Sequence, residues 1–563
     1  MKLTNLASLH GYGPAVARAL AELDAHKIME RIWAKDHTVW KPEPTEIANR
    51  LAWLHVVKET RAAAPRLHGL LDAARALGCT HAILFGMGGS SLAPEVFRRT
   101  FGVAEGALDL EVLDSTDPGA VLAHEARLDP ARTLHIVATK SGGTVETFSF
   151  FRSFYNRAAK TLGKERAGRH FVAITDPGSK LAEIASSLGF LATLENDPDI
   201  GGRYSALSFF GMGPAALLGV PVETVLDRAL SLGERCRTAP AVENPAAFLG
   251  AALGELAKAG RDKMTLVVSD GLSSLGDWIE QLVAESTGKE GRGVLPVVGE
   301  PVGAPQAYGP DRVFVHVRLD GDASRDAAVS ALEAAGHPIV RIPVADRLDL
   351  GALFFLFELA TAVAGERLRI NPFDQPDVES AKVSARKVVA EYATRGSLPQ
   401  ESPVLVDGGI EVFAREPVPS VDGLFAFLLE GAAAGAYVAL QAYVTPDAGT
   451  ARALDALRLA IRDRWRVAST VGFGPRFLHS TGQLHKGDRG NGLFVQLTAD
   501  HARDVAIPDE IGSDRSTMTF GVLIAAQAMG DAEALRQAGR RVVRVHLGAD
   551  PVAGIERLTR TLG

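Results

Sequence analysis

Cysteine is nearly absent from this sequence. Only Cys79 and Cys236 occur among 563 residues, and neither lies in a CxxC pair or a Cys/His cluster. A disulfide scaffold and a structural zinc site are therefore excluded as the basis of the fold. We expect both thiols to be reduced and buried, because free cysteine behaves as a small apolar residue.

Long apolar runs and an excess of basic charge are lacking as well. No run approaches the ~18 apolar residues of a membrane span, and residues 1–20 lack the apolar core of a secretory signal. The formal net charge is −7, which argues against general nucleic-acid binding, since that function leaves a basic footprint. The sequence predicts a cytoplasmic protein that binds neither membranes nor nucleic acids.

The composition is that of a large globular chain, with 47% hydrophobic and 23% charged residues. At roughly 150 residues per domain, its length suggests about three or four compact units. Residues 1–75 have a helical, amphipathic pattern, with Trp33, Trp40 and Trp53 as expected packing anchors. Beyond them, short apolar runs alternate with helical patterns, which is typical of parallel sheets covered by helices.

Three sets of strands are predicted. The first comprises residues 81–85, 110–113, 134–138 and 171–175. The second comprises residues 264–269, 313–318 and 339–344, with a helix at 274–287. The third comprises strands 436–444, 467–473, 492–498 and 542–547, with helices at 450–462 and 519–538. We therefore predict an α/β protein with a helical segment at 1–75 and domains at 76–240, 241–392 and 393–563.

Each strand of the first set ends in a polar or glycine-rich turn. The four turns read GMGGSS, DSTDP, TKSGGT and TDPGS. Parallel strands share a carboxyl edge, which is where ligands bind in open α/β sheets. We therefore expect these four turns to converge.

Two of the turns are suited to a phosphate. Glycines in GMGGSS let backbone N–H groups approach an anion at a helix N-terminus, although an ordinary tight turn has the same pattern. The turn TKSGGT adds one cation and three hydroxyls, which match the charge and acceptor oxygens of a phosphomonoester. The expected phosphate contacts are Gly89, Ser90, Thr139, Lys140, Ser141 and Thr144.

A dinucleotide site is the competing interpretation of the first turn. Asp114 ends the next strand, where a ribose-binding acid would stand. However, Ser91 occupies the third glycine position of a GxGxxG fingerprint. A P-loop is also excluded, because no Gly-Lys-Ser/Thr closes the turn.

Two further motifs suggest proton-transfer chemistry. Gln281 and Glu285 are four residues apart on an expected helix, so they share a face. A carboxylate over a substrate can move a proton between adjacent carbons, and a surface acid is the plainer interpretation. Arg203 follows two glycines that leave room for a ligand. It is suited to an enediolate oxyanion, or to an ordinary structural ion pair.

Lys382 and His479 are the remaining candidates. Lys382 falls in the first turns of a helix that follows NPFDQP, where a solvated lysine is the plainer interpretation. His479 and His485 are six residues apart, which fits no familiar metal spacing. His479 is suited to acid–base work near neutral pH, or is a structural histidine.

Taken together, these motifs resemble the glucose-6-phosphate isomerase family. The resemblance rests on GMGGSS, TKSGGTVET, GGRYS, QLVAESTGK, NPFDQPDVESAK and HSTGQ. It covers residues 75–390 and the histidine segment near residue 479. It implies two doubly wound sugar-isomerase (SIS) domains, here with an extra C-terminal α/β region.

The resemblance implies reversible interconversion of glucose 6-phosphate and fructose 6-phosphate through a cis-enediolate, with no metal or organic cofactor. Glu285 would shuttle the proton between C1 and C2, and Arg203 would stabilise the intermediate. Gln281 would line the site. His479 and Lys382 would assist opening of the sugar ring.

Two departures from the family pattern stand out. The histidine segment follows the NPFDQP segment instead of preceding it, an order similar to the isomerase half of bifunctional transaldolase/glucose-6-phosphate isomerases. No transaldolase-like portion precedes Met1, so isomerase activity alone is expected. Gly143 stands where the family commonly has threonine, so one phosphate contact is expected from a backbone N–H.

Several alternatives stay open at this stage. In the family the neighbouring subunit supplies the histidine, but a relocated His479 would also fit its own site. A monomer and a homodimer are thus both consistent with the sequence. Mannose 6-phosphate is an alternative additional substrate, and a sugar-phosphate sensor without chemistry is the alternative from another class.

Overall fold

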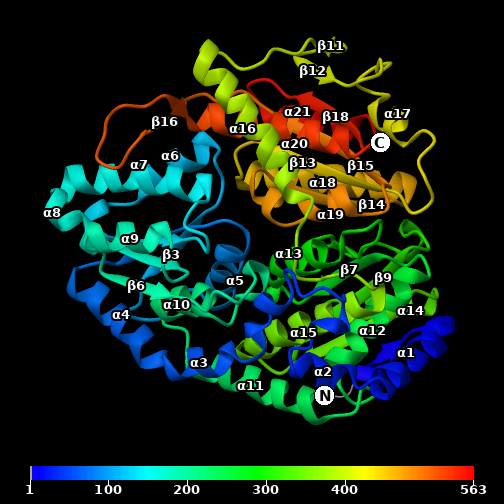
Figure 1. The fold of residues 1–563 in the computed structure, drawn as a ribbon. Coiled ribbons are helices and arrows are strands. Elements are labelled where there is room, and N and C mark those ends of the chain that lie inside the picture. Colours follow the sequence, from blue (N-terminus) through cyan, green and yellow to red (C-terminus); the bar gives the residue numbers. More distant parts are fainter. Residues whose placement is uncertain (1–2, 563) are drawn as a thin grey trace.

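The computed structural model describes residues 3–562, which fold around three large β-sheets (Figure 1). The first sheet is wholly parallel and has the strand order β3-β2-β4-β5-β6. Its strands are β2 (His81–Phe85), β3 (Asp109–Leu113), β4 (Thr133–Ala138), β5 (Phe171–Thr175) and β6 (Ala192–Glu195). The sequence predicted the first four. It missed β6, which is short and mostly half-buried, so no apolar run marks it.

The second sheet has the order β1-β10-β9-β7-β8. Its strands are β1 (Ala7–Ser8), β7 (Lys263–Val268), β8 (Leu295–Val297), β9 (Arg312–Leu319) and β10 (Ile339–Val344). β1 pairs antiparallel with β10 at the sheet edge. The prediction of a purely helical N-terminal segment was therefore wrong at β1, because two residues are too few to carry a strand pattern.

The third sheet has the order β11-β12-β18-β15-β13-β14. Its strands are β11 (Leu405–Asp407), β12 (Ile410–Phe413), β13 (Tyr437–Tyr443), β14 (Ala468–Phe473), β15 (Gly492–Thr498) and β18 (Arg541–His546). The four predicted strands form its parallel part, and β11 and β12 add an antiparallel edge.

Helices cover the sheets. The N-terminal ones are α1 (Gly13–Ala25), α2 (Ile28–Trp33), α3 (Val56–Ala62) and α4 (Ala64–Ala76). Those around the first sheet are α5 (Leu92–Phe101), α6 (Pro118–Arg127), α7 (Val145–Leu162), α8 (Lys164–Ala167), α9 (Lys180–Ser187) and α10 (Phe209–Leu217). Next come α11 (Val222–Thr238), α12 (Pro245–Lys258), α13 (Leu275–Thr287), α14 (Asp326–Ala334), α15 (Leu350–Leu368) and α16 (Val378–Arg395). The last are α17 (Leu424–Leu429), α18 (Ala448–Trp465), α19 (Gly482–Gly487), α20 (Phe520–Gln537) and α21 (Pro551–Arg560).

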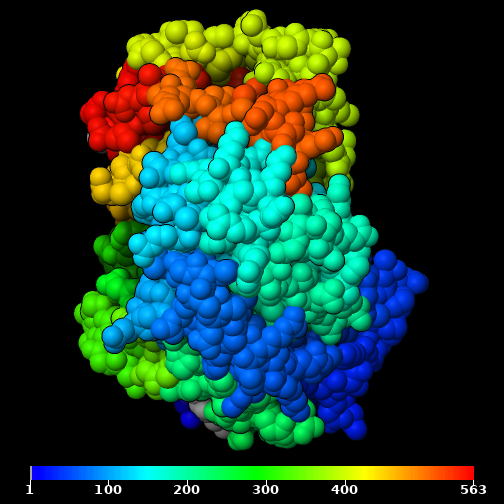
Figure 2. All heavy atoms as spheres, turned by 90° about the vertical axis from the view of Figure 1, so that its left-hand side faces the viewer, coloured from blue at the N-terminus to red at the C-terminus, as the bar shows by residue number. Residues whose placement is uncertain are grey.

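The C-terminal region reaches over the first sheet. The segment between β15 and α20 forms the short hairpin β16 (Ala506–Ile507) and β17 (Met518–Thr519). In Figure 2 this orange segment lies against the cyan helices that cover the first sheet. Ile507 and Phe520 are buried in the same apolar cluster as Phe150 of α7. The two parts of the chain thus share a core.

Helix α15 is long, apolar and largely buried. The segment Arg347–Leu368 is long and apolar enough to cross a membrane, but 83% of its most apolar window is buried inside the protein. It packs against α11, α12 and α13. Burial of this kind is what a core helix of a globular protein shows. The prediction that no run approaches the length of a membrane span was wrong for this helix, because Glu358 and Thr361 interrupt the run without removing its overall apolar character.

The cysteines behave as predicted. Cys79 and Cys236 are free and buried. Burial raises the pKa of each thiol to about 11, so both are neutral near pH 7 and poor nucleophiles.

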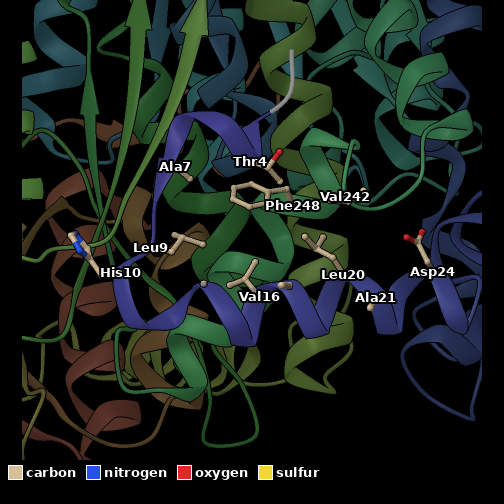
Figure 3. A pocket seen from close by; sticks show the side chains of 12 residues that line it. Thr4, Ala7, Leu9, His10, Val16, Leu20, Ala21, Asp24, Val242 and Phe248 are labelled. Carbon is tan, nitrogen blue, oxygen red and sulfur yellow. The ribbon is translucent and has the colours of Figure 1, made fainter.

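A cleft of about 470 Å³ lies between α1 and α12 (Figure 3). Its walls are mostly apolar and include Leu9, Val16, Leu20 and Phe248. None of the candidate site residues lines it. The polar motifs lie elsewhere.

Candidate active site

Two glycines bring separate motifs into contact. The turn after β2 forms a 3-10 helix, η6 (Gly88–Ser90). An added Cβ at Gly88 would stand 2.7 Å from the carbonyl oxygen of His479 and 2.8 Å from Nε2 of Gln281. An added Cβ at Gly89 would stand 2.0 Å from the carbonyl oxygen of Gly202. No side chain fits at either position, so glycine permits the approach.

Glu285 is held from two sides. Its Oε1 lies 3.3 Å from Nη1 of Arg203, which is carried by η9 (Gly202–Tyr204). Its Oε2 accepts a hydrogen bond of 3.0 Å from Nε2 of Gln281, one turn earlier on α13. The Arg203 side chain is 2% exposed and that of Glu285 is 12% exposed. The predicted shared face of Gln281 and Glu285 is therefore present, with the carboxylate partly open.

Arg203 also binds the segment between α15 and α16. Its Nη2 donates to the carbonyl oxygens of Pro372 (2.7 Å) and Asp374 (2.9 Å), and its Nη1 donates to Oε1 of Gln375 (3.0 Å). Its Nε donates to Oγ of Ser286 (2.8 Å). The planar guanidinium serves all these acceptors at once, which the single ammonium of a lysine cannot do.

His479 lies in the same site as Glu285 of its own chain. It ends the 3-10 helix η13 (Arg476–His479), and its carbonyl oxygen accepts a hydrogen bond of 2.8 Å from Nε2 of Gln281. Its ring Nε2 is 3.0 Å from Oε1 of Glu146, in the first turn of α7. One amide of Gln281 therefore contacts both the Glu285 carboxylate and the His479 backbone.

Glu146 and the two residues that hold it through hydrogen bonds, Gln527 and Thr116, were not predicted from the sequence. Nε2 of Gln527, on α20, donates to Oε1 of Glu146 at 2.7 Å, and Oγ1 of Thr116 donates to Oε1 of Gln527 at 2.8 Å. Glu146 lies within the TKSGGTVET motif, so that motif was the available signal. Gln527 is 381 residues away from Glu146 in the chain, and no local pattern marks it.

Glu146 is ionised in this environment. Burial acts to raise its pKa, but the charge of His479, the His479 hydrogen bond and the charge of Lys382 together hold the pKa below its ordinary value. The contact between the Glu146 carboxylate and Nε2 of His479 fixes the orientation of the imidazole ring.

Lys382 is exposed in the first turns of α16, as predicted. Its charge makes the smallest contribution among those that lower the pKa of Glu146, after the charge and hydrogen bond of His479. α16 in turn packs closely on α20, where an added Cβ at Gly530 would stand 2.5 Å from the backbone nitrogen of Ala385. α20 therefore supports both the helix that carries Lys382 and the carboxylate that contacts His479.

The TKSGGT turn presents hydroxyls at the carboxyl end of β4. Oγ1 of Thr139 is 2.9 Å from Oγ1 of Thr144, the residue before α7. The Lys140 ammonium is directed elsewhere, to the carboxylate of Asp176 and the carbonyl oxygen of Pro198. The Lys140 ammonium and the two threonine hydroxyls are thus close in sequence but have different partners. Asp176 neutralises the charge of Lys140.

The other expected phosphate contacts differ in exposure, and Gly89 is buried. Ser141 and Gly143 are exposed, and Ser90 is half-buried at the end of η6. Their backbone and hydroxyl donors are available to a ligand. Their assignment to a phosphate stays a prediction.

Asp114, the residue that would bind a ribose in the competing dinucleotide interpretation, already has a hydrogen-bond partner. Oδ2 of Asp114 accepts a hydrogen bond of 3.2 Å from Oγ of Ser91. Burial raises the pKa of Asp114, opposed by the charge of Arg476. A buried carboxyl bonded to the adjacent turn is poorly suited to a ribose.

Neither His485 nor the group of potential metal ligands in the described residues belongs to this site. His485 is buried, 3.3 Å from Nε2 of Gln441, and burial holds its pKa well below the ordinary value, so it is a structural histidine. Within residues 3–562, one group of potential ligands lies close together, formed by His55, Glu59 and Asp197. These side chains belong to none of the motifs.

Comparison with known proteins identifies the family. The phosphoglucose isomerase model matches residues 71–294. A glucose-6-phosphate isomerase of Cyanothece sp. (strain PCC 7425 / ATCC 29141) is 31% identical over 412 residues, which span 66% of this chain and 76% of that protein. The chain belongs to the phosphoglucose isomerase family. A glucose-6-phosphate isomerase of Rubrobacter xylanophilus is likewise 31% identical, over 55% of this chain and 82% of the relative.

Two solved structures share the fold of this chain. The hypothetical protein TT0462 of Thermus thermophilus has a TM-score of 0.57 at 26% identity, covering 67% of this chain and 98% of that chain. A glucose-6-phosphate isomerase of Chlamydia trachomatis also has a TM-score of 0.57, at 18% identity, covering 67% and 86%. The predicted α/β fold is therefore confirmed.

Glu280, beside the site, has a strongly raised pKa. It precedes Gln281 on α13 but lies buried, 8% exposed. Burial, reinforced by the charge of Asp277, raises its pKa to about 8, against an ordinary 4.5. The folded protein therefore keeps this carboxyl protonated at neutral pH.

We predict that Glu280→Gln stabilises the protein in a pH-dependent way. Between pH 4.5 and 8 the unfolded chain releases this proton and the folded chain retains it, so wild-type stability falls as the pH rises through that window. The neutral amide has no such titration. The midpoint of thermal unfolding of the variant, relative to wild type, should thus rise from pH 5 to pH 8. An equal difference at both pH values would contradict the prediction.

Proposed function

We propose that this protein interconverts glucose 6-phosphate and fructose 6-phosphate by proton transfer. The observation that carries the proposal is the Glu285 carboxylate, 3.3 Å from Arg203 and 3.0 Å from Gln281, with its side chain 12% exposed. A positioned carboxylate paired with a cation has the two parts that enolisation requires: a base for the proton, and a positive charge for the oxygen that becomes an anion.

The other groups have assigned roles in the proposal. The phosphate is held by the hydroxyls of Thr139 and Thr144 and by the backbone of the turn. Lys140 leaves its ion pair with Asp176 and binds the phosphate instead. His479, paired with Glu146, moves a proton at the ring oxygen. Lys382, on α16, assists His479 in ring opening, and its charge contributes to lowering the pKa of Glu146.

Proton transfer then follows from this arrangement. Glu285 takes the proton from C2 of the open aldose and returns it to C1, and the Arg203 guanidinium stabilises the cis-enediolate between the two steps. No metal or organic cofactor is required in this scheme. A sugar-phosphate sensor would have no use for a base, an oxyanion partner and a His–Glu pair together. A cytoplasmic location belongs to the same proposal.

We predict that Glu285→Gln lowers kcat by at least about 10²-fold, since general-base catalysis contributes about 10²–10⁴-fold. The amide keeps the shape and the Gln281 contact, so fructose 6-phosphate should still bind. A coupled assay and isothermal titration calorimetry measure the two effects. Glu183→Gln, at an exposed residue of α9, serves as the matched control. Wild-type kcat in the Glu285 variant would remove the base assignment.

We also propose that each chain completes its own site. Supporting this, Gln281 contacts Glu285 (3.0 Å) and the His479 carbonyl (2.8 Å) of the same chain. The close approach of Gly88 to His479 adds a second contact between the two segments. A homodimer remains compatible with such sites, but catalysis does not depend on it.

Complementation between inactive variants tests this point. Glu285→Gln and His479→Ala copies, co-expressed with different tags and purified together, should show no recovery of activity. If partner chains shared the site, a mixed dimer would contain one intact site, and on the order of a quarter of the activity would return in a random mixture. Such recovery would overturn the single-chain arrangement.

We predict that Gln527→Leu lowers kcat about tenfold by releasing Glu146, because small misplacements of catalytic groups can cost on the order of 10²-fold. Gln537→Leu, at an exposed position of the same helix, should leave kcat unchanged. In a His479→Ala background the Gln527 substitution should add nothing, because both act through one unit. An undiminished tenfold loss in that background would show a purely structural role.

A further inference from the structure

A second polar cleft lies away from the residues of the proposed active site. Its volume is about 460 Å³, within the ~300–1,000 Å³ typical of small-molecule sites. It is lined by Ala257, Lys258, Arg292, Gly293, Arg367, Leu368, Arg369 and Arg489. Every charged residue in that lining is cationic, although the chain as a whole carries a formal net charge of −7. The cleft is therefore a local reversal of the charge of the molecule.

Two of the cations in the lining, Arg292 and Arg369, lack a carboxylate partner among the described residues. Two others, Lys258 and Arg367, are neutralised: both pair with Glu255 at 2.8 Å, and Arg367 also pairs with Glu22 (2.7 Å) and Glu366 (3.5 Å). In the described part of the chain, residues 3–562, neither Arg292 nor Arg369 forms an ion pair. Arg292 instead donates a hydrogen bond to a backbone carbonyl in the same lining, that of Leu368.

The third exposed arginine is only partly neutralised. Nη2 of Arg489 lies 3.3 Å from a carboxylate oxygen of Asp262, and the arginine side chain is 42% exposed. Asp262 also pairs with the buried Lys263 at 2.6 Å, so one carboxylate serves two cations. Arg489 therefore retains positive charge for a ligand.

The backbone at Arg369 is an independent anomaly. Arg369 ends α15 with φ of +57°. A residue other than glycine in this left-handed region is uncommon, because its Cβ approaches the following carbonyl oxygen. Glycine and asparagine are the usual residues at this position after a helix. Arg369 thus occupies an unfavourable backbone conformation, and its side chain lines the cleft.

We propose that this cleft binds a small polyanion that carries at least two phosphate or carboxylate groups. Guanidinium groups bind such groups through paired hydrogen bonds, and three segments of the chain contribute one exposed arginine each. Arg292 follows α13, Arg369 ends α15, and Arg489 lies between α19 and β15. A monoanion would leave most of these donors without a partner.

The same three segments lead into the proposed active site, so occupancy of the cleft is coupled to it. Between Glu285 and Arg292, Lys289 binds the carboxylate of Asp374 at 2.7 Å, within the segment that Arg203 holds. Gly291 donates to the carbonyl oxygen of Gly487 at 3.0 Å, at the end of α19 that follows His479. A ligand that bridges the three arginines thus restrains the chain segments that carry Glu285, Asp374 and His479.

Pyrophosphate is the probe for this site. Calorimetric titration of the full chain, in metal-free buffer with saturating fructose 6-phosphate, should give one site per chain. The double variant Arg292→Gln/Arg369→Gln should weaken that binding at least tenfold. Arg18→Gln, at an exposed residue of α1, should leave it unchanged. Raising the salt from about 50 to about 200 mM should weaken binding to the wild type, because exposed charges are screened.

The outcomes separate the cleft from the isomerase site. Binding to the phosphate turn is displaced by fructose 6-phosphate, whereas binding to the cleft persists. Absent binding, or equal affinity in wild type and double variant, would overturn the site. A dissociation constant that is identical with and without fructose 6-phosphate would overturn the coupling, since linkage is reciprocal. The heat of binding does not require turnover, so failure of the proposed isomerase activity is recognised independently.

Discussion

The guanidinium of Arg203 is the interaction on which the rest of the site depends. It donates to Ser286 on α13 and to the segment at Pro372 and Asp374, and it lies 3.3 Å from Glu285. A cation buried to this degree is tolerated only when its donors are satisfied. Its neighbours are therefore fixed as a set, which gives the Glu285 carboxylate one defined position at the junction of two sheets.

Close backbone approach completes this arrangement. The missing side chains at Gly88 and Gly89 let the turn after β2 touch the His479 and Gly202 backbones. The C-terminal region then contributes in two ways: η13 carries the histidine, and α20 holds the Glu146 carboxylate through Gln527. The region beyond residue 393 therefore contacts the candidate site through Glu146, and residues of its β16–β17 hairpin share an apolar cluster with α7.

Local pattern was enough for elements whose burial is regular. Fully buried parallel strands such as β2 and β5 have continuous apolar sequences, so they were predicted to the residue. Elements without such a pattern were missed, among them β1, which is two residues long, and the antiparallel edge strands β11 and β12. Lys140 shows the same limit at the site, since its ion pair with Asp176 depends on how two turns face each other.

By itself, the sequence determined the α/β class, because the alternation of apolar runs and helical patterns is a local property. It also supplied Glu285, Arg203 and His479 as candidates, through motifs that resemble those of the family. Only the tertiary structure decided that Gln281 contacts both Glu285 and the His479 backbone within one chain, that Gln527 holds Glu146, and that three distant arginines line one cleft. These are contacts between segments hundreds of residues apart in several cases. They follow from how helices and sheets pack, which no local pattern encodes.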